Sequence, residues 1–252
     1  MEVAARGPAA LALWLVRPFA KRRSARGLTR IAWEEINLGR LTSGRFYAEA
    51  AVAADPSYPH GYRMLAWAYD RAGDLDAARS ACQRGLAVAP ADADLLAQAG
   101  DLERRRDRPA DAEVYYRRAL ARQPDSPRLL WQLANAVAWQ NRVEEAAALL
   151  ERALELAPDD PRVLSLLGQV RRQRGDYVGA IDVLSRAVTL RPEMAEAYLP
   201  GAYYELALSH TVLRQWEAAQ QAIAQAVALA PEDAEIVKLH RVLEHPEHLI
   251  IE

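Results

Sequence analysis

Cysteine is nearly absent from this sequence, with a single residue at position 82. One thiol per chain can form no internal disulfide and cannot supply a cluster of thiolates for zinc, so both are excluded. Lysine is almost missing too, because only Lys21 and Lys238 accompany 30 arginines. We read the arginine excess mainly as compositional bias. The lone cysteine favours a reducing compartment, and we expect the cytoplasm.

Motifs that carry catalysis are missing as well. The chain contains no phosphate-binding loop, nucleophile elbow, HExxH helix or paired-cysteine motif. His240, His245 and His248 are spaced so that they share no single helical face, and we expect them to be solvated. Cys82 falls in a column of apolar residues and is predicted to be a core residue. We therefore expect no enzyme, no catalytic residue, no metal and no cofactor.

Long apolar runs are also lacking. The uncharged run at residues 8–16 is about half of the roughly 20 residues that span a bilayer. As a secretory signal it is poor, because basic residues follow it and no convincing cleavage site is present.

Charge is unevenly distributed along the chain. Within residues 1–30, seven cations accompany one carboxylate, which gives a net charge of +6 and leaves −8 on the rest of the chain.

This basic, apolar arm (residues 1–24) is predicted to anchor the protein. The anchor residues are Leu13, Trp14, Arg17, Lys21, Arg22 and Arg23. They could dock on a partner protein or cap the first repeat. They could instead lie on an anionic membrane surface, which would make the protein peripheral at the membrane. Nucleic acid is disfavoured as a partner, because the arm interleaves few aromatics with its charges and the rest of the chain is acidic.

Proline recurs with a fixed period along the rest of the chain. The spacing is 34 residues four times and then 39, at Pro56, Pro90, Pro124, Pro158, Pro192 and Pro231. Such a period is the mark of stacked structural repeats. Aligned on the prolines, small residues form columns, one of which is Ala32, Ala66, Gly100, Ala134, Gly168 and Ala207. Small side chains let helix backbones approach closely, and large apolar columns between them fill the gaps, so we expect two antiparallel helices per repeat.

These columns resemble those of the tetratricopeptide repeat (TPR) family. The family pattern is clearest at Tyr62, Leu65, Ala66, Tyr69, Ala78 and Pro90. The resemblance implies an all-α, right-handed superhelical solenoid of helix pairs. We expect a degenerate unit at 25–58, units at 59–92, 93–126, 127–160, 161–194 and 195–233, and a capping helix and tail at 234–252.

The fifth full unit departs from the pattern. Five residues, 195–199, are inserted, and Pro200-Gly201 stands where a first helix should begin. Either that helix starts at Pro200 after a longer connection, or a longer helix bends there. The insertion is either a tolerated junction or a local binding feature marked by Tyr198, Tyr203 and Tyr204.

The resemblance further implies that ligands bind along the concave face lined by the first helix of each pair. The predicted groove residues are Trp33, Arg63, Trp67, Asp101, Arg105, Arg128, Trp131, Asn135, Trp139, Arg162 and Gln169. Tryptophan and arginine are typical anchors of binding surfaces. On the inner positions of units 59–92 to 161–194, seven arginines outnumber three aspartates, which favours an acidic or carboxylate-terminated segment.

Other interpretations of these residues stay open. Arginines in the last turn of a helix also complement the helix dipole, and Trp33 and Trp67 could pack on each other or on the arm. We predict a non-enzymatic scaffold that binds a peptide segment or helix of a partner protein. The alternatives are a self-assembling homo-oligomer and a subunit of an envelope export or secretion machine.

Overall fold

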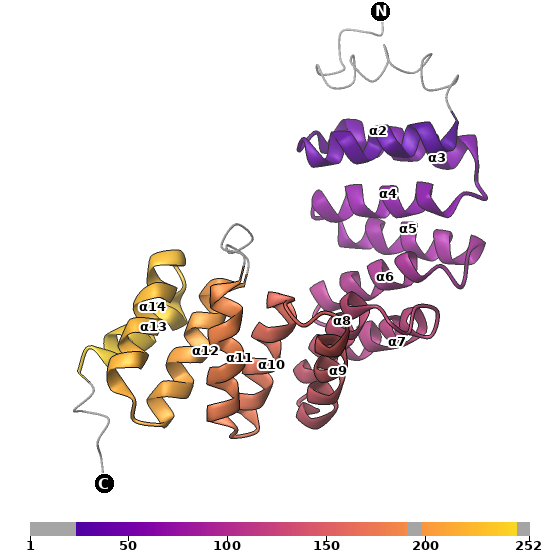
Figure 1. Cartoon of the computed structure of the whole chain (residues 1–252). Coiled ribbons are helices and arrows are strands. Elements are labelled where there is room, and N and C mark those ends of the chain that lie inside the picture. The colour runs from indigo at the N-terminus through magenta and orange to yellow at the C-terminus, as the bar shows by residue number, and fades with distance from the viewer. Residues whose placement is uncertain (1–23, 191–197, 246–252) are drawn as a thin grey trace, which may run out of the picture. The chain divides into compact units, whose positions relative to one another are not determined.

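The computed structural model describes residues 24–190 and 198–245, which form helices and connecting turns and, over these ranges, no strand (Figure 1). The helices are α2 (Ala25–Asn37), α3 (Leu41–Ala54), α4 (Pro59–Arg71), α5 (Leu75–Val88), α6 (Ala93–Arg105), α7 (Pro109–Leu120), α8 (Pro127–Trp139), α9 (Val143–Leu156), α10 (Pro161–Gln173), α11 (Tyr177–Thr189), α12 (Leu199–Val212), α13 (Trp216–Leu229) and α14 (Ala234–Leu243). The predicted all-α repeat fold is confirmed.

The helices pack as consecutive pairs. The most extensive contacts join α2 with α3, α4 with α5, and so on to α12 with α13. The chain divides into two compact units, one ending at Pro124 and the other beginning at Asp125. Unit 1 contains α2–α7 and unit 2 contains α8–α14. Within each unit the first helices of successive pairs also touch, as α4 touches α6 and α10 touches both α8 and α12.

Local sequence explains where the first helices begin. Asp92, Ser126 and Asp160 each accept a backbone N–H from the first turn of the helix that follows, which satisfies a donor that no helical carbonyl can reach. Proline opens α8 and α10, where its missing N–H costs nothing. These caps mark where α6, α8 and α10 begin.

The small-residue columns lie where helices cross. A Cβ added at Gly100 of α6 would meet the ring of Tyr116 on α7, and one added at Gly168 of α10 would overlap the side chain of Leu184 on α11. Both partners are fully buried. Cys82 is buried as well, as predicted, and burial raises the pKa of its thiol to about 12. Glycine at 100 and 168 therefore permits a close approach that a larger residue would prevent.

The inserted unit begins its first helix at Leu199, with Pro200 in the first turn. Of the two alternatives, the structure thus shows a helix that starts beside Pro200 rather than a longer helix that bends there. At the end of the chain, α14 packs on α13 as a lone helix, and the side chain of Gln220 donates to the Leu243 carbonyl at 2.7 Å. Over the described residues, no helix combines the length and the hydrophobicity needed to traverse a bilayer.

Candidate binding surface

Every predicted groove residue lies on the first helix of a pair. Trp33 is on α2, Arg63 and Trp67 are on α4, Asp101 and Arg105 are on α6, Arg128, Trp131, Asn135 and Trp139 are on α8, and Arg162 and Gln169 are on α10. They are divided between the two units, five in unit 1 and six in unit 2. The predicted anchor residues at positions 13–23 lie outside the described residues.

In unit 1 the polar groove residues connect neighbouring repeats. Arg63 of α4 forms an ion pair with Asp94 of α6, and Arg105 of α6 forms one with Asp70 of α4. Each pair joins residues about one repeat apart. Asp101 accepts a hydrogen bond from the hydroxyl of the buried Tyr116 at 2.7 Å. These side chains therefore hold adjacent helix pairs together as well as lining a surface.

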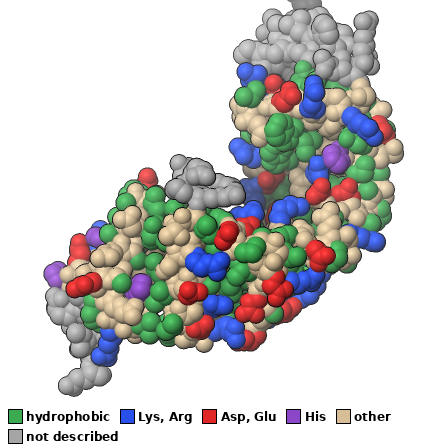
Figure 2. All heavy atoms as spheres, viewed as in Figure 1, with side chains coloured by type: hydrophobic (Ala, Val, Ile, Leu, Met, Phe, Trp, Pro, Cys, Tyr) green, Lys and Arg blue, Asp and Glu red, His purple; other side chains and the backbone are tan. Residues whose placement is uncertain are grey.

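Pairing with carboxylates is general among the inner arginines. In unit 2, Arg162 pairs with Asp160, and Arg172 of α10 pairs with Glu205 of α12. At least four of the seven inner arginines thus meet a carboxylate of the chain. On the visible face of each unit, acidic and basic side chains are intermixed (Figure 2). The positive charge available to a ligand is smaller than the residue count suggested.

The inner tryptophans differ in exposure. Trp33 and Trp139 are 53% and 57% exposed, whereas Trp67 and Trp131 are partly buried. Scattered apolar exposure is ordinary on a soluble protein. A partly buried indole beside a hollow is a stronger candidate for an anchor, because it is held in place and still presents an edge or face.

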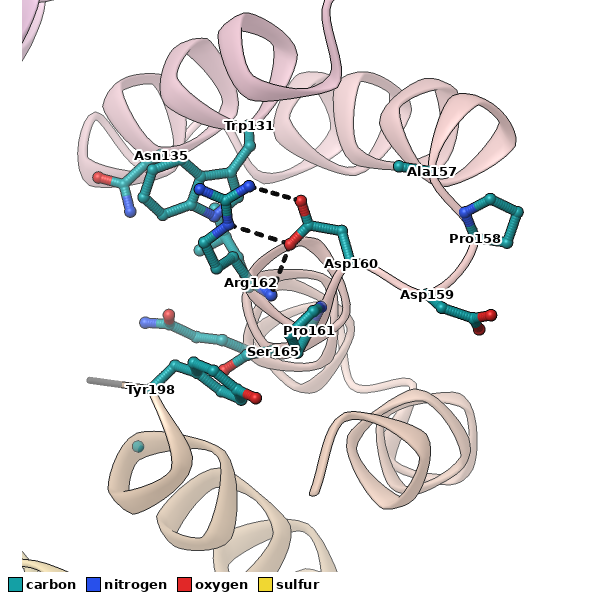
Figure 3. A pocket seen from close by; sticks show the side chains of 13 residues that line it. Trp131, Asn135, Ala157, Pro158, Asp159, Asp160, Pro161, Arg162, Ser165 and Tyr198 are labelled. Atoms are coloured by element: carbon teal, nitrogen blue, oxygen red, sulfur yellow. Dashed lines mark hydrogen bonds and ion pairs between the residues drawn. The ribbon is translucent and has the colours of Figure 1, made fainter. Parts of the chain in front are cut away.

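Such a hollow lies in unit 2, between the inner helices α8, α10 and α12 (Figure 3). Its volume is about 780 Å³. Its lining combines apolar, amide and charged groups, namely Trp131, Asn135, Ala157, Pro158, Asp159, Asp160, Pro161, Arg162, Ser165, Leu166, Gln169, Tyr198 and Gly201. Four of these were predicted as groove residues. We call this hollow the Trp131 pocket.

Arg162 folds back across the pocket onto the indole. Its guanidinium carbon lies 5.7 Å from the centre of the Trp131 ring. Its Nε donates to Asp160 Oδ1 at 3.1 Å and its Nη2 to Oδ2 at 2.7 Å, so the fork holds both carboxylate oxygens (Figure 3). Burial opposes ionisation of Asp160, but the hydrogen bonds from Arg162 outweigh it and keep the pKa of the carboxyl below its usual value. Donation to the Asp160 carboxylate likewise raises the pKa of Arg162.

Two polar atoms at this site are buried without a hydrogen-bond partner. They are Nε1 of Trp131, a donor, and Oδ1 of Asn135, an acceptor. The residues are four apart on α8 and therefore lie on the same helix face. Buried polar atoms are nearly always satisfied in native proteins, so a donor and an acceptor left over beside a hollow suggest a ligand that supplies both groups.

The far wall of the pocket comes from the irregular unit. Tyr198, which precedes α12, donates its hydroxyl to the Leu190 carbonyl at 3.1 Å, and a Cβ at Gly201 would meet no atom within 4 Å. The prediction of groove residues from the repeat columns missed Asp160 and Gly201. The insertion and its tyrosines were the available signal for this wall.

No cluster of histidine, cysteine or acidic side chains suited to a metal occurs among residues 24–190 and 198–245. His240 lies beside Glu244, with Nδ1 and Oε1 3.8 Å apart.

Comparison with known proteins places this chain in a family. Two tetratricopeptide repeat models match the sequence, at residues 29–93 and 104–170. The APC/C hetero-tetramer Cut9-Hcn1 has a similar structure, with a TM-score of 0.77 and 17% identity over 92% of this chain. This chain spans only 45% of that one. No curated protein matches the sequence.

Two further solved structures are similar over most of their own length. PilW, described as a widely conserved type IV pilus biogenesis factor, has a TM-score of 0.74 and 21% identity, covering 85% of this chain and 97% of that one. Pseudomonas aeruginosa pilF has a TM-score of 0.75 and 16% identity, covering 86% and 96%. At these identities the likeness concerns the fold. With its helix pairs and its two matching repeat models, the chain belongs to the tetratricopeptide repeat family.

Proposed function

We propose that this protein is a non-enzymatic scaffold that captures a peptide segment of a partner protein on the inner helices of its repeats, with the Trp131 pocket as the main anchor point. The TPR fold supports a role in protein–protein interaction, and one structural neighbour, YrrB, is described as having an unusual peptide-binding site. In that neighbour the identity is 16%, so the binding mode here is argued from this chain alone.

The observation that carries the proposal is the unpaired donor and acceptor beside the pocket. A peptide main chain offers one carbonyl and one N–H per residue. A ligand carbonyl could accept from Trp131 Nε1, and a ligand N–H could donate to Asn135 Oδ1. Both protein atoms are buried and lack a partner, so satisfying them would recover a desolvation cost that the free protein bears.

Size supports the same role. A volume of about 780 Å³ is within the range of pockets that take small molecules or several side chains. Apolar groups from Pro158, Pro161 and Leu166 adjoin the amides of Asn135 and Gln169. Such a mixture suits an extended segment that buries one or two side chains. The predicted preference for acidic segments stays a prediction, as do the contribution of a helical segment, membrane association and oligomerisation.

The test is capture of the partner by variants. Copurification from the native source with Trp131→Ala is expected to lose the partner, because a tryptophan at the centre of an interface typically contributes about 2–4 kcal/mol. Trp67→Ala tests unit 1 in the same way. Val178→Ala is the matched control, since Val178 is 70% exposed on an outer helix. Circular dichroism must show unchanged helix content. Unchanged capture by the Trp67→Ala/Trp131→Ala double variant would refute the proposal.

A further inference from the structure

Arg162 occupies an unusual position for an exposed arginine. The residue lies in the first turn of α10, yet its guanidinium extends back over the indole of Trp131 on α8. Long cationic side chains ordinarily extend into water, because fixing them costs rotamer freedom. Here the fork to Asp160 and the aromatic face hold the group in place.

The surroundings of this guanidinium supply two groups that recognise arginine. A flat indole face attracts a cation through its quadrupole. A carboxylate in fork geometry binds two guanidinium N–H groups. Guanidinium carries five donors and no acceptor, so an arginine is chemically suited to both the indole face and the carboxylate.

A guanidinium can also replace Arg162 at this site without leaving Asp160 unpaired. Asp160 forms an ion pair with Arg162, and Oδ1 of the neighbouring Asp159 lies 3.6 Å from Nη2 of Arg186. An arriving carboxylate would have to take Arg162 from Asp160 and would leave two negative charges close together. An arriving guanidinium exchanges one cation for another, so Asp160 remains paired while Arg162 moves to solvent.

We propose that the Trp131 pocket contains an arginine subsite, that Arg162 fills it in the free protein, and that an arginine of the partner segment displaces Arg162 on binding. This inference rests on the proposed peptide-binding function and names the side chain that the pocket reads. At this pocket the inference favours a basic side chain of the partner, whereas the excess of arginine over aspartate on the inner positions predicted an acidic segment.

The displacement has a measurable signature, because the internal arginine competes with the ligand. When only the open fraction of a site can bind, the apparent affinity falls by that fraction. Arg162→Ala removes the competitor. It should therefore strengthen binding of an arginine ligand, by about tenfold if Arg162 covers the site roughly 90% of the time, whereas loss of an ordinary contact residue weakens binding.

The experiment uses the full-length chain and three blocked pentapeptides, acetyl-Gly-Ala-Xaa-Ala-Gly-amide with arginine, lysine or citrulline as Xaa. Binding is read by NMR from the indole N–H resonance of Trp131, which Trp131→Phe identifies among the six tryptophans. We expect the arginine peptide to bind Arg162→Ala about tenfold more tightly than wild type, the lysine peptide more weakly, and the isosteric but uncharged citrulline peptide not at all.

Asp160→Asn supplies the second arm of the experiment. Asparagine caps a helix as well as aspartate does, so α10 keeps its N-cap while the subsite loses its charge. Binding of the arginine peptide to Arg162→Ala/Asp160→Asn should disappear, and unchanged thermal unfolding would show that the fold is intact. Equal or weaker binding by Arg162→Ala, or equal binding of the citrulline peptide, would overturn the inference.

The two proposals can fail separately. If Trp131→Ala abolishes partner capture while Arg162→Ala does not strengthen the arginine peptide, the scaffold function stands and the arginine subsite is refuted. If Arg162→Ala strengthens the peptide as expected and Trp131→Ala leaves partner capture unchanged, the subsite is supported and the proposed role of the pocket in capture is refuted.

Discussion

The hydroxyl of Tyr116 is predicted to hold unit 1 together through Asp101. Tyr116 on α7 is fully buried, its ring packs against Gly100 of α6, and its hydroxyl donates to Asp101 Oδ1 at 2.7 Å. Tyr116→Phe keeps the ring and removes the hydroxyl, with its hydrogen bond to the charged acceptor Asp101 and its hydrogen bond with Arg104. Such bonds contribute about 1.5–3 kcal/mol, so we expect a loss of that size in the free energy of unfolding. The melting temperature should fall by about 3–12 °C, at 2–4 °C per kcal/mol for a chain of this length.

The dependence on pH gives a second readout of the same bond. Burial, reinforced by the charge of Asp101 and its hydrogen bond, raises the pKa of Tyr116 well above its usual value. The folded protein therefore keeps this proton at a pH where the unfolded chain, with a tyrosine pKa near 10, releases it. Stability contributed by the neutral hydroxyl is present below pH ~10 and is lost as the pH rises above it. Tyr116→Phe should lack this loss of stability at alkaline pH.

The assay is denaturant unfolding followed by circular dichroism, at neutral pH and above pH 10. Tyr115→Phe is the matched control. It also removes a tyrosine hydroxyl, and it keeps the aromatic ring that Arg118 contacts. A double-mutant cycle with Asp101→Ala isolates the pair. A Tyr116→Phe variant as stable as the Tyr115→Phe control, with the same alkaline sensitivity as wild type, would refute the reasoning.

Three further predictions concern packing and ionisation. Gly168→Ala should destabilise by about 1–3 kcal/mol, because its methyl group overlaps a buried leucine. Gly201→Ala, which meets open space, should not destabilise, and thermal melts compare the two. Cys82, buried with a pKa raised to about 12, should resist alkylation at pH 8 until denaturant is added, and rapid labelling of the native protein would contradict its core position. The pKa of Asp160 is lowered, so its stabilising pair with Arg162 should persist above pH ~3.8 and be lost as the pH falls further. Acid titration of wild type against Asp160→Asn by NMR checks this, and identical acid profiles would exclude it.

The repeat architecture was predictable because its cause is local and periodic. Proline stands at the same distance before α4, α6, α8 and α10, a side-chain N-cap precedes the last three of these helices, and glycine at 100 and 168 lies where two helices pack closely. Each repeat makes most of its contacts within itself and with its neighbours. A column of aligned residues therefore translates directly into a position on a helix pair.

The ion pairs of the inner surface were harder to predict. Arg63 pairs with Asp94, and Arg105 pairs with Asp70. Each partner lies on the next or the preceding repeat and in a different column. A count of charges within one column therefore treats these arginines as unpaired, although the folded protein pairs them with carboxylates. An acidic residue 31–35 positions away was the signal, and it could have been sought.

The pocket depended on an irregularity rather than on the period. Asp160 is the N-cap of α10 and looks purely structural in sequence, yet its second role is to hold Arg162 across Trp131. Tyr198 and Gly201 form the opposite wall because the fifth full unit is longer than the others. An alignment of repeats leaves such insertions out. The sequence therefore indicated that this unit is irregular, but it did not predict that the unit forms a wall of the pocket.

Site-directed photocrosslinking from the inner surface of unit 2 tests the central claim most directly. A photoreactive amino acid at Gln169, inside the Trp131 pocket, and the same group at Val178, on an outer helix, would be compared in the native source. The account predicts a discrete crosslinked partner from position 169 that disappears with Trp131→Ala, and none from position 178. Equal crosslinking from both positions, unaffected by Trp131→Ala, would contradict it.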